Sequence, residues 1–302
     1  MNAVPPRPFR IFQGEDAVVP PIALTPRDDG DDGDDADVLA SLDPHAVAVQ
    51  ELLRAAGPPP AGRTLEEFSR SWFEELELKR YAPHGDWLRR TLEFTRHPHD
   101  TMLMMGPGAG TDAVQYQRHG TAVTICTTPD DCPALIRRNF EQRGLTVRVG
   151  RTNPDGTLPY EPGRFDLAYL NWLYTPPADA AARVAEVYRV LKPGGKAFVL
   201  APSKFDAGFW QRVFTPWRPW MRGDGALSPA PRYSGRSLRR LFGPFTEPVT
   251  VKRHLRRSEL PYLWRSSPLS LMQRVMGRVL VLKAFKPIAA ALAAPAALPK
   301  AA

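Results

Sequence analysis

Metal-binding and disulfide-forming residues are scarce in this sequence. The 302 residues include two cysteines and six histidines. Only five residues separate Cys126 from Cys132, and no histidine cluster lies beside them, so we expect no zinc site or other metal and no disulfide framework. Sparse use of cysteine fits a reducing compartment, and we expect the protein in the cytoplasm.

Long apolar runs are absent as well. Three prolines fall within the first eight residues, which contain no continuous apolar core, so we expect no cleavable secretory signal. Towards the C-terminus, the run VLVLKAFKPIAAALAAPAAL is interrupted by Lys283, Lys286, Pro287 and Pro295. No stretch approaches the roughly 20 apolar residues that a membrane-spanning helix needs. The sequence therefore predicts no transmembrane segment.

Charge is abundant but unevenly placed. The formal net charge is +8, yet the first third holds the acidic run DDGDDGDDAD, whereas Lys and Arg gather in the last third. An acidic run between prolines is typical of a solvated, disordered tail. The basic segment KRHLRRSELPYLWR at 252–265 faces anionic lipid or nucleic acid or, more commonly, forms a solvated surface. Because no recognised nucleic-acid motif accompanies it, we predict no specific nucleic-acid partner.

Composition divides the chain into three parts. Residues 1–60 carry the acidic run and repeated prolines, which predict a largely disordered N-terminal extension with one short helix at 43–56. Residues 61–287 are expected to form one domain, with an aromatic and basic insertion at about 203–234. Residues 288–302 form an Ala- and Pro-rich tail.

Helical patterns begin immediately after the N-terminal extension. Thr64 and Glu67 form a capping box that predicts the start of a helix, since apolar residues follow at helical spacing. A second helix is expected at 85–96 and a later one at 235–242.

Short apolar runs alternate with helical stretches from residue 100 onward. They predict strands, with helices between them, at 101–105, 122–126, 146–149, 166–171 and 196–200. Two further apolar stretches, 249–255 and 278–285, are expected to pair as an antiparallel hairpin. This alternation predicts an α/β domain with a mostly parallel sheet covered by helices on both faces.

The most informative string is MLMMGPGAGTD, which begins at Met102. An apolar strand leads directly into glycines at 106, 108 and 110, and a helix is expected to start near Gly110. Glycines allow a ligand to approach the backbone closely, and a helix N-terminus offers free amide groups. The spacing differs from the dinucleotide fingerprint G-x-G-x-x-G, and no Lys-Ser/Thr pair follows as in a phosphate-binding loop. Alone, the pattern fits either a ligand-binding turn or a tight turn without a ligand.

Two later segments add specificity to the glycine turn. RFDLAYLNW has the form of a fourth strand, and VAEVYRVLKPGGKAFVL is a helix broken by Pro193 and a glycine pair before a fifth strand. In this order and spacing, the three segments resemble class I S-adenosylmethionine-dependent methyltransferases, in particular a bacterial subgroup, over about residues 81–287. The resemblance implies a Rossmann-like, doubly wound sheet of seven strands, mostly parallel with an antiparallel terminal strand. It also implies S-adenosylmethionine as cofactor.

The resemblance also implies roles for individual residues around the glycine turn. Gly106, Gly108 and Gly110 would lie under the methionine part of S-adenosylmethionine. Thr111 and Asp112 would cap the next helix or touch the ligand.

The two acidic positions of such a pocket are altered in this chain. Cys126, Thr127 and Thr128 stand where residues facing the ribose are expected, and a thiol is a poor acceptor. Loss of a charged acceptor costs roughly 1.5 to 3 kcal/mol, which the threonine hydroxyls would partly offset. Arg151 stands where an acid facing the adenine is expected. Asp155 replaces that acid if the loop folds back, although the sequence NPDG also fits a simple turn.

Methyl transfer is an in-line attack on a sulfonium carbon, so positioning supplies much of the rate. Asn171, Trp172 and Tyr174, after the fourth predicted strand, are candidates to reach the donor and the substrate. If the acceptor is a hydroxyl, Tyr174 or His254 would help to remove its proton, although both residue types more often have structural or surface roles.

The acceptor is expected to be a small or lipid-like molecule. Trp210, Phe214, Trp217 and Trp220 lie in the insertion and fit a lid over an apolar acceptor or, equally, a patch that covers the sheet edge. A peripheral membrane contact through these tryptophans and nearby arginines is a further expectation.

Two alternative functions remain open from the residues alone. The altered acidic positions also fit a methyltransferase-fold protein that has lost the reaction and acts as a partner or regulator. A nicotinamide-dependent oxidoreductase is disfavoured, because the third glycine is misplaced and the ribose-binding acid is absent.

Overall fold

The computed structural model describes residues 39, 42, 66–81, 85–214, 231–257, 260 and 264–288. All of them lie within one compact unit, Ala36–Ala302. The predictions for a helix at 43–56, for Trp217 and Trp220, and for the chain beyond 288 fall outside the described residues. Within the predicted N-terminal extension, Leu39 and Leu42 are described, and they pack against an apolar cluster that contains Phe73.

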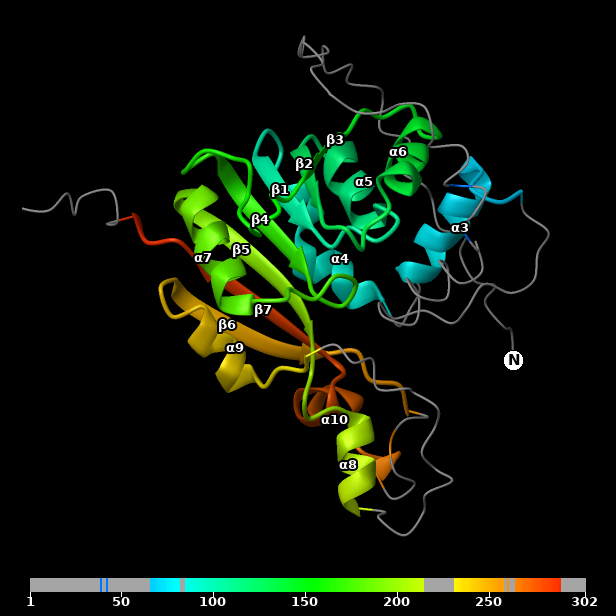
Figure 1. The fold of residues 1–302 in the computed structure, drawn as a ribbon. Helices are drawn as coiled ribbons and strands as arrows, with labels where there is room; N and C mark the ends of the chain where they lie inside the picture. Colours follow the sequence, from blue (N-terminus) through cyan, green and yellow to red (C-terminus); the bar gives the residue numbers. More distant parts are fainter. Residues whose placement is uncertain are drawn as a thin grey trace, which may run out of the picture. The chain divides into compact units, whose positions relative to one another are not determined.

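Seven strands form one sheet in the order β3-β2-β1-β4-β5-β7-β6 (Figure 1). Parallel pairing joins five of them: β1 (Thr101–Met105), β2 (Ala122–Thr127), β3 (Arg148–Arg151), β4 (Phe165–Asn171) and β5 (Leu191–Pro202). β7 (Val279–Phe285) lies antiparallel between β5 and β6 (Thr246–Arg253). The predicted seven-stranded, mostly parallel sheet is confirmed, including the pairing of the last two strands.

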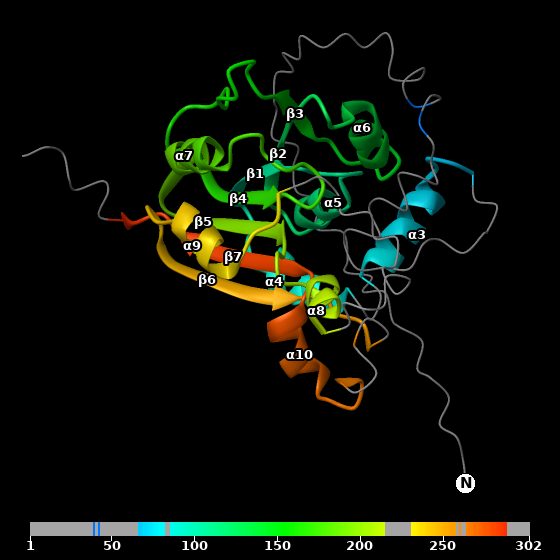
Figure 2. The same ribbon diagram turned by 60° about the horizontal axis from the view of Figure 1, so that its bottom comes forward.

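Helices cover both faces of the sheet (Figure 2). On one face, apolar side chains of the strands pack against three helices: α4 (Asp86–Leu92), α5 (Thr111–Arg118) and α6 (Pro133–Glu141). On the other face they pack against α7 (Ala180–Val190) and α9 (Gly235–Leu241). Within β1, Met102 and Met104 enter the first core and Leu103 enters the second, because successive side chains of a strand point to opposite faces. This burial on both sides explains why the central strands are apolar throughout.

The helix predicted from the capping box begins later than Thr64. α3 spans Arg70–Arg80, and the Ser69 side chain accepts a hydrogen bond from the Trp72 amide at 3.3 Å. Phe68 has a left-handed φ of 54°, which a helix continuing from Thr64 would not allow. The predicted start at Thr64 is therefore wrong, because Ser69 is the residue that satisfies the first-turn amides.

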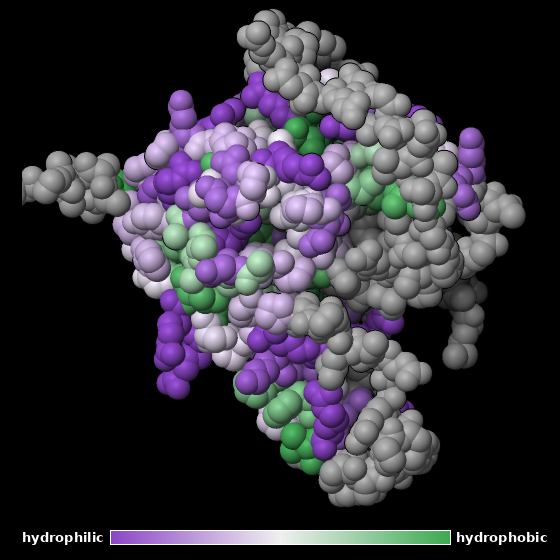
Figure 3. All heavy atoms as spheres, viewed as in Figure 1, coloured by the Kyte–Doolittle hydropathy of each residue, from purple (hydrophilic) through white to green (hydrophobic). Residues whose placement is uncertain are grey.

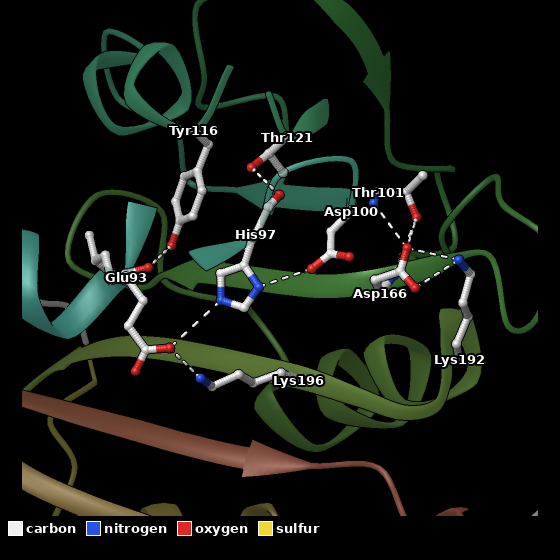
Figure 4. A network of polar contacts seen from close by, with 10 residues as sticks. Glu93, His97, Asp100, Thr101, Tyr116, Thr121, Asp166, Lys192 and Lys196 are labelled. Atoms are coloured by element: carbon white, nitrogen blue, oxygen red, sulfur yellow. Dashed lines mark hydrogen bonds and ion pairs between the residues drawn. The ribbon is translucent and has the colours of Figure 1, made fainter. Parts of the chain in front are cut away.

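The predicted helix at 85–96 is interrupted. α4 ends at Leu92, because Glu93 has a left-handed φ of 56°, and a separate 3-10 turn, η1 (Phe94–Arg96), follows. The Glu93 carboxylate accepts hydrogen bonds from Lys196 of β5 at 2.5 Å and from Lys283 of β7 at 2.6 Å. Figure 4 shows Glu93 between Lys196 and His97. This ion cluster ties the end of α4 to two strands of the sheet.

Replacing Glu93 by glutamine is expected to destabilise the protein more at neutral pH than in acid. Burial alone would raise the pKa of Glu93, but Lys196 and Lys283 outweigh it and lower the pKa to about 2. A carboxylate with a lowered pKa stabilises the fold above its unfolded-state pKa and loses this contribution as pH falls towards the folded value. Denaturant unfolding should show a deficit of about 1–3 kcal/mol at pH 6 that shrinks near pH 2. The control is Glu141→Gln, because Glu141 is exposed, and it should change the free energy of unfolding little at either pH. A deficit in Glu93→Gln that did not depend on pH would show that Lys196 and Lys283 do not lower the pKa of Glu93.

A small lobe of two helices, which we name the α8–α10 lobe, lies beyond the ends of β5 and β6 (Figure 1). It contains α8 (Ala207–Phe214) and α10 (Leu269–Met276). These helices share an apolar cluster that buries Ala207 and Met276 and has Trp210 packed against it. Among the described residues, no helix combines the length and apolar character needed to cross a membrane.

Candidate functional site

The glycine turn at residues 106–110 joins β1 to α5 at the carboxyl edge of the sheet, between the ends of β2 and β4. Gly106, Gly108 and Gly110 have left-handed φ values of 68°, 58° and 81°. A Cβ at Gly106 would lie 2.3 Å from the backbone oxygen of Asn171, so β4 itself requires that glycine. Gly106 and Gly110 are buried and Gly108 is half-buried. Of the three, Gly108 is therefore the one whose backbone is accessible to a ligand.

The N-cap residue of α5 is Gly110, which has no side chain, and no side-chain cap hydrogen bond is made at this position among the described residues. The N-cap position is therefore Gly110 and neither Thr111 nor Asp112, while a contact of Thr111 or Asp112 with the ligand stays a prediction. Uncapped first-turn amides, together with the helix dipole, favour a negatively charged group such as a carboxylate.

Asp112 instead lies in a buried polar network. Its Oδ1 accepts hydrogen bonds from Arg80 Nε at 2.7 Å and from the Tyr81 hydroxyl at 2.6 Å. Its Oδ2 accepts from Arg80 Nη2 at 2.5 Å and from the Tyr169 hydroxyl at 2.7 Å. Burial alone would raise the pKa of Asp112, but Arg80 and the hydrogen bonds outweigh it and lower the pKa. The network joins α3, β4 and the first turn of α5, which follows the glycine turn.

Tyr174 is connected to this network, whereas His254 is not. Arg80 Nη1 donates a hydrogen bond to the Tyr174 hydroxyl, and Tyr174 is half-buried just after β4. His254 is buried just after β6, which lies three positions from β4 in the sheet. At strand spacings of 4.7–4.9 Å this is a separation of about 14 Å. The two candidate bases predicted from the sequence are therefore not brought together.

The end of β2 differs from the predicted ribose-facing surface. Cys126 is fully buried in the core on the α7 side, and burial raises the pKa of its thiol to about 11, so the thiol is neutral at pH 7. Thr127 is also buried, and its hydroxyl donates to the Gly150 carbonyl at 3.0 Å. Only Thr128, of these three predicted residues, is half-buried at the rim.

Asp131 is a carboxylate at this rim that the sequence analysis missed. Its Oδ2 accepts from the Thr128 amide at 2.7 Å and the Thr128 hydroxyl at 3.0 Å, and its Oδ1 accepts from the Thr175 hydroxyl at 2.7 Å. It therefore links the loop after β2 to the loop after β4, on either side of β1. Since a carboxylate has about four acceptor positions, these three hydrogen bonds leave one for a ligand. Its position five residues after Cys126 was the signal for it in the sequence.

The loop after β3 does not supply a second acid. Arg151 is exposed at the end of β3, and Asp155 is exposed and accepts hydrogen bonds from the Thr157 amide and hydroxyl at 2.9 and 2.7 Å. The simple-turn interpretation of NPDG is confirmed. The loop then returns to the sheet at Leu158, which packs in the same core as Cys126.

The residues after β4 divide between the core and the rim. Asn171 and Trp172 are buried, and the Trp172 ring packs 5.2 Å from Tyr233 and 6.3 Å from Phe242. Trp172 is therefore a core residue. Tyr174 and Thr175 are half-buried, as are Gly108, Thr128 and Asp131. These five residues follow the carboxyl ends of β1, β2 and β4, and we name them the carboxyl-edge rim.

Comparison with known proteins identifies the family of this chain. A family model described as a methyltransferase domain matches residues 102–195. A demethylmenaquinone methyltransferase of Thermus thermophilus is 30% identical over 152 residues, which are 44% of this chain and 69% of the relative. The chain belongs to the class I S-adenosylmethionine-dependent methyltransferases. These enzymes take the transferred methyl group from S-adenosylmethionine.

Other methyltransferases match more distantly. The ubiquinone/menaquinone biosynthesis C-methyltransferase of Shewanella halifaxensis is 25% identical over 143 residues, 46% of this chain and 57% of that protein. The solved geranyl diphosphate C-methyltransferase of Streptomyces coelicolor has a TM-score of 0.51 and 13% identity, with 83% of this chain and 97% of that chain covered. Its likeness supports the methyltransferase fold.

The residues of the rim fit S-adenosylmethionine in part. The glycine turn and the uncapped α5 N-terminus suit the amino-acid end of the donor, which carries a carboxylate. The buried Cys126 thiol does not suit the ribose, whereas Thr128 and Asp131 offer hydroxyl and carboxylate oxygens at the same rim. The polar oxygens at this rim therefore come from Thr128 and Asp131 and not from residue 126.

Proposed function

We propose that this methyltransferase transfers the methyl group of S-adenosylmethionine to an apolar acceptor, a small or lipid-like molecule, bound over the carboxyl-edge rim. The observation that carries the proposal is the glycine turn, which presents the half-buried Gly108 and the uncapped N-terminus of α5 at the same point of the sheet. S-adenosylmethionine, when bound, supplies an electrophilic methyl group on a sulfonium.

The chain's own residues would hold the donor at three places. Gly108 and the first amides of α5 would face the methionine part, and Thr128 with Asp131 would accept hydrogen bonds from the ribose. Tyr174, whose hydroxyl is positioned by Arg80, is the better placed of the two predicted bases to take a proton from an acceptor hydroxyl. The remaining rate would come from alignment of donor and acceptor.

The apolar character of the acceptor is supported by relatives and by the lobe. The matched proteins are named for demethylmenaquinone and for geranyl diphosphate, which are molecules with large apolar parts. In this chain, the aromatic residues Phe205, Phe209 and Trp210 lie edge to face in series next to the end of β5. They would provide an apolar wall for such an acceptor.

Titration calorimetry of the full chain with S-adenosylmethionine and S-adenosylhomocysteine tests donor binding. We expect micromolar affinity, and we expect Asp131→Asn to weaken it about tenfold, because a hydrogen bond to a charged acceptor is worth about 1.5–3 kcal/mol. Asp130→Asn is the matched control, since Asp130 is exposed. No heat at millimolar donor would contradict the proposal and would favour the alternative of an inactive partner protein.

A peripheral membrane contact through the α8–α10 lobe belongs to the same proposal. Val213 of α8 and Leu271 and Val275 of α10 are 49%, 52% and 41% exposed, and Arg212 and Arg274 beside them are exposed too. Figure 3 shows apolar and hydrophilic surfaces side by side on this lobe. Amphipathic helices with arginines on their polar face bind anionic bilayers.

Co-sedimentation with phosphatidylglycerol vesicles tests this contact. We expect the chain to bind them more strongly than phosphatidylcholine vesicles, and we expect Leu271→Glu to reduce binding severalfold. Val249→Glu is the control, because Val249 is 57% exposed on β6, outside the lobe. Equal binding by wild type and Leu271→Glu would refute the contact.

A further inference from the structure

We propose that a cleft between α4, the end of β6 and α10 is a second binding site, which takes a small molecule with an apolar body and one carboxylate. The cleft has a volume of about 340 Å³ and is lined by residues of all three elements, including Trp87, Arg253, Leu255, Leu269 and Gln273. Such a volume is in the range of pockets that hold small ligands. Figure 2 shows α10 directly beyond the end of β6.

Three side chains of the cleft carry hydrogen-bond donors without partners. The Trp87 indole nitrogen is buried and makes no hydrogen bond. Within the described part of the chain, neither the Arg253 guanidinium nor the Gln273 side-chain amide has a hydrogen-bond or ion-pair partner. Buried polar groups are normally paired, so the unpaired Trp87 N–H is unfavourable, whereas the Arg253 and Gln273 side chains are half-buried. Donors from three elements that line one cleft therefore fit the acceptor oxygens of a ligand.

The charge of the cleft selects an anion. Asp86 and Arg90 also line it, but they pair with each other at 3.3 Å. Arg253 is left as the uncompensated charge. A guanidinium binds a carboxylate through two parallel hydrogen bonds, so we assign the carboxylate of the ligand to Arg253.

The walls of the cleft select an apolar body. Leu255 is buried, and Leu269 and the Trp87 ring are half-buried. These surfaces offer no hydrogen bonds apart from the indole N–H, and a bare inorganic anion would leave them unfilled. A ring or short chain attached to the carboxylate would cover them.

The cleft is separate from the glycine turn. Arg253 and Pro202 both pair with Val279, so the cleft lies at the carboxyl edge of the sheet. However, β6 is four positions from β1, which corresponds to about 19 Å. The apolar carboxylate is therefore either the far end of a long methyl acceptor or a separate effector molecule.

Titration calorimetry of the full chain with 1-naphthoate tests the site. We expect binding in the submillimolar range and a loss of about tenfold in Arg253→Gln, which removes the bidentate pairing. 1-Naphthylmethanol has the same ring without the charge, and Arg253→Gln should not change its affinity. Trp87→Phe keeps the ring but removes the N–H, and it should weaken 1-naphthoate severalfold. Arg236→Gln, which changes an exposed arginine of α9, is the control.

The proposal would be overturned if 1-naphthoate at 10 mM gave no heat. It would also be overturned if Arg253→Gln bound 1-naphthoate as tightly as the wild type and melted at the same temperature. Repeating the titration with saturating S-adenosylhomocysteine shows whether the natural ligand of the cleft is the methyl acceptor or a separate effector. A changed affinity identifies the site as part of the acceptor pocket, and an unchanged affinity identifies a separate effector. Since 1-naphthoate is measured without the donor, a failure of donor binding would leave this result intact.

Discussion

Replacement of Arg80 by alanine is expected to lower the free energy of unfolding by about 3–5 kcal/mol. Arg80 and Asp112 are 1% and 3% exposed, and removal of the guanidinium leaves the Asp112 carboxylate buried without its cation. The Tyr81 and Tyr169 hydroxyls would remain as its neutral donors. They do not compensate a buried charge, so the cost should approach that of breaking a buried ion pair.

Urea denaturation of Arg80→Ala and Arg90→Ala provides the matched comparison. Arg90 pairs with Asp86 on α4, but the two side chains are 85% and 54% exposed. An exposed pair contributes about 0–1 kcal/mol. Similar losses in the two variants would contradict the importance that we give to the buried network. We also expect Arg80→Ala to remove one hydrogen-bond donor from the Tyr174 hydroxyl, because Arg80 donates to it.

Gly106→Ala is expected to cost about 3–5 kcal/mol of stability and to abolish donor binding. The alanine Cβ would lie 2.3 Å from the Asn171 carbonyl oxygen, which belongs to the backbone of β4. Relief of that overlap requires movement of β1 away from β4 at the glycine turn. The left-handed φ of 68° adds a separate penalty for any residue with a Cβ.

Gly144→Ala separates these two penalties. Gly144 has a similar left-handed φ of 63°, but a Cβ there would meet nothing within 4 Å. It should cost only the backbone term, about 1–2 kcal/mol. Urea denaturation would measure the free energy of unfolding of both variants. If Gly106→Ala lost no more stability than Gly144→Ala, β4 would be able to move away from the turn at little cost, and the prediction would be wrong.

The architecture of the sheet could be predicted from the sequence because its signals are local. The glycine turn, the fourth apolar strand and the RVLKPGG element predicted the family, and the last two apolar stretches form the antiparallel pair as expected. Helix ends were less predictable. Ser69 rather than Thr64 caps the first described helix, and Glu93 ends α4 early because Lys196 and Lys283 hold its carboxylate.

The candidate site could be predicted only in part. Gly108, Thr128 and Tyr174 lie at the carboxyl-edge rim, whereas Cys126, Thr127 and Trp172 are buried. The neighbouring sequence does not show that Arg80 is buried in an ion pair. Arginine is rarely buried without a partner, and the partner of Arg80, Asp112, lies 32 residues away in the chain.

The sequence by itself determined the parallel sheet, the positions of its main strands and the glycine turn after β1, because hydrophobic period and glycine spacing are properties of neighbouring residues. The tertiary structure decided which polar groups are buried together and which remain open to a ligand. Asp112 is neutralised by Arg80, Asp131 joins two loops at the rim, and Arg253 faces a cleft beside Trp87. Burial and pairing of charge depend on contacts between segments distant in the chain, and these contacts form only when the sheet and its helices pack.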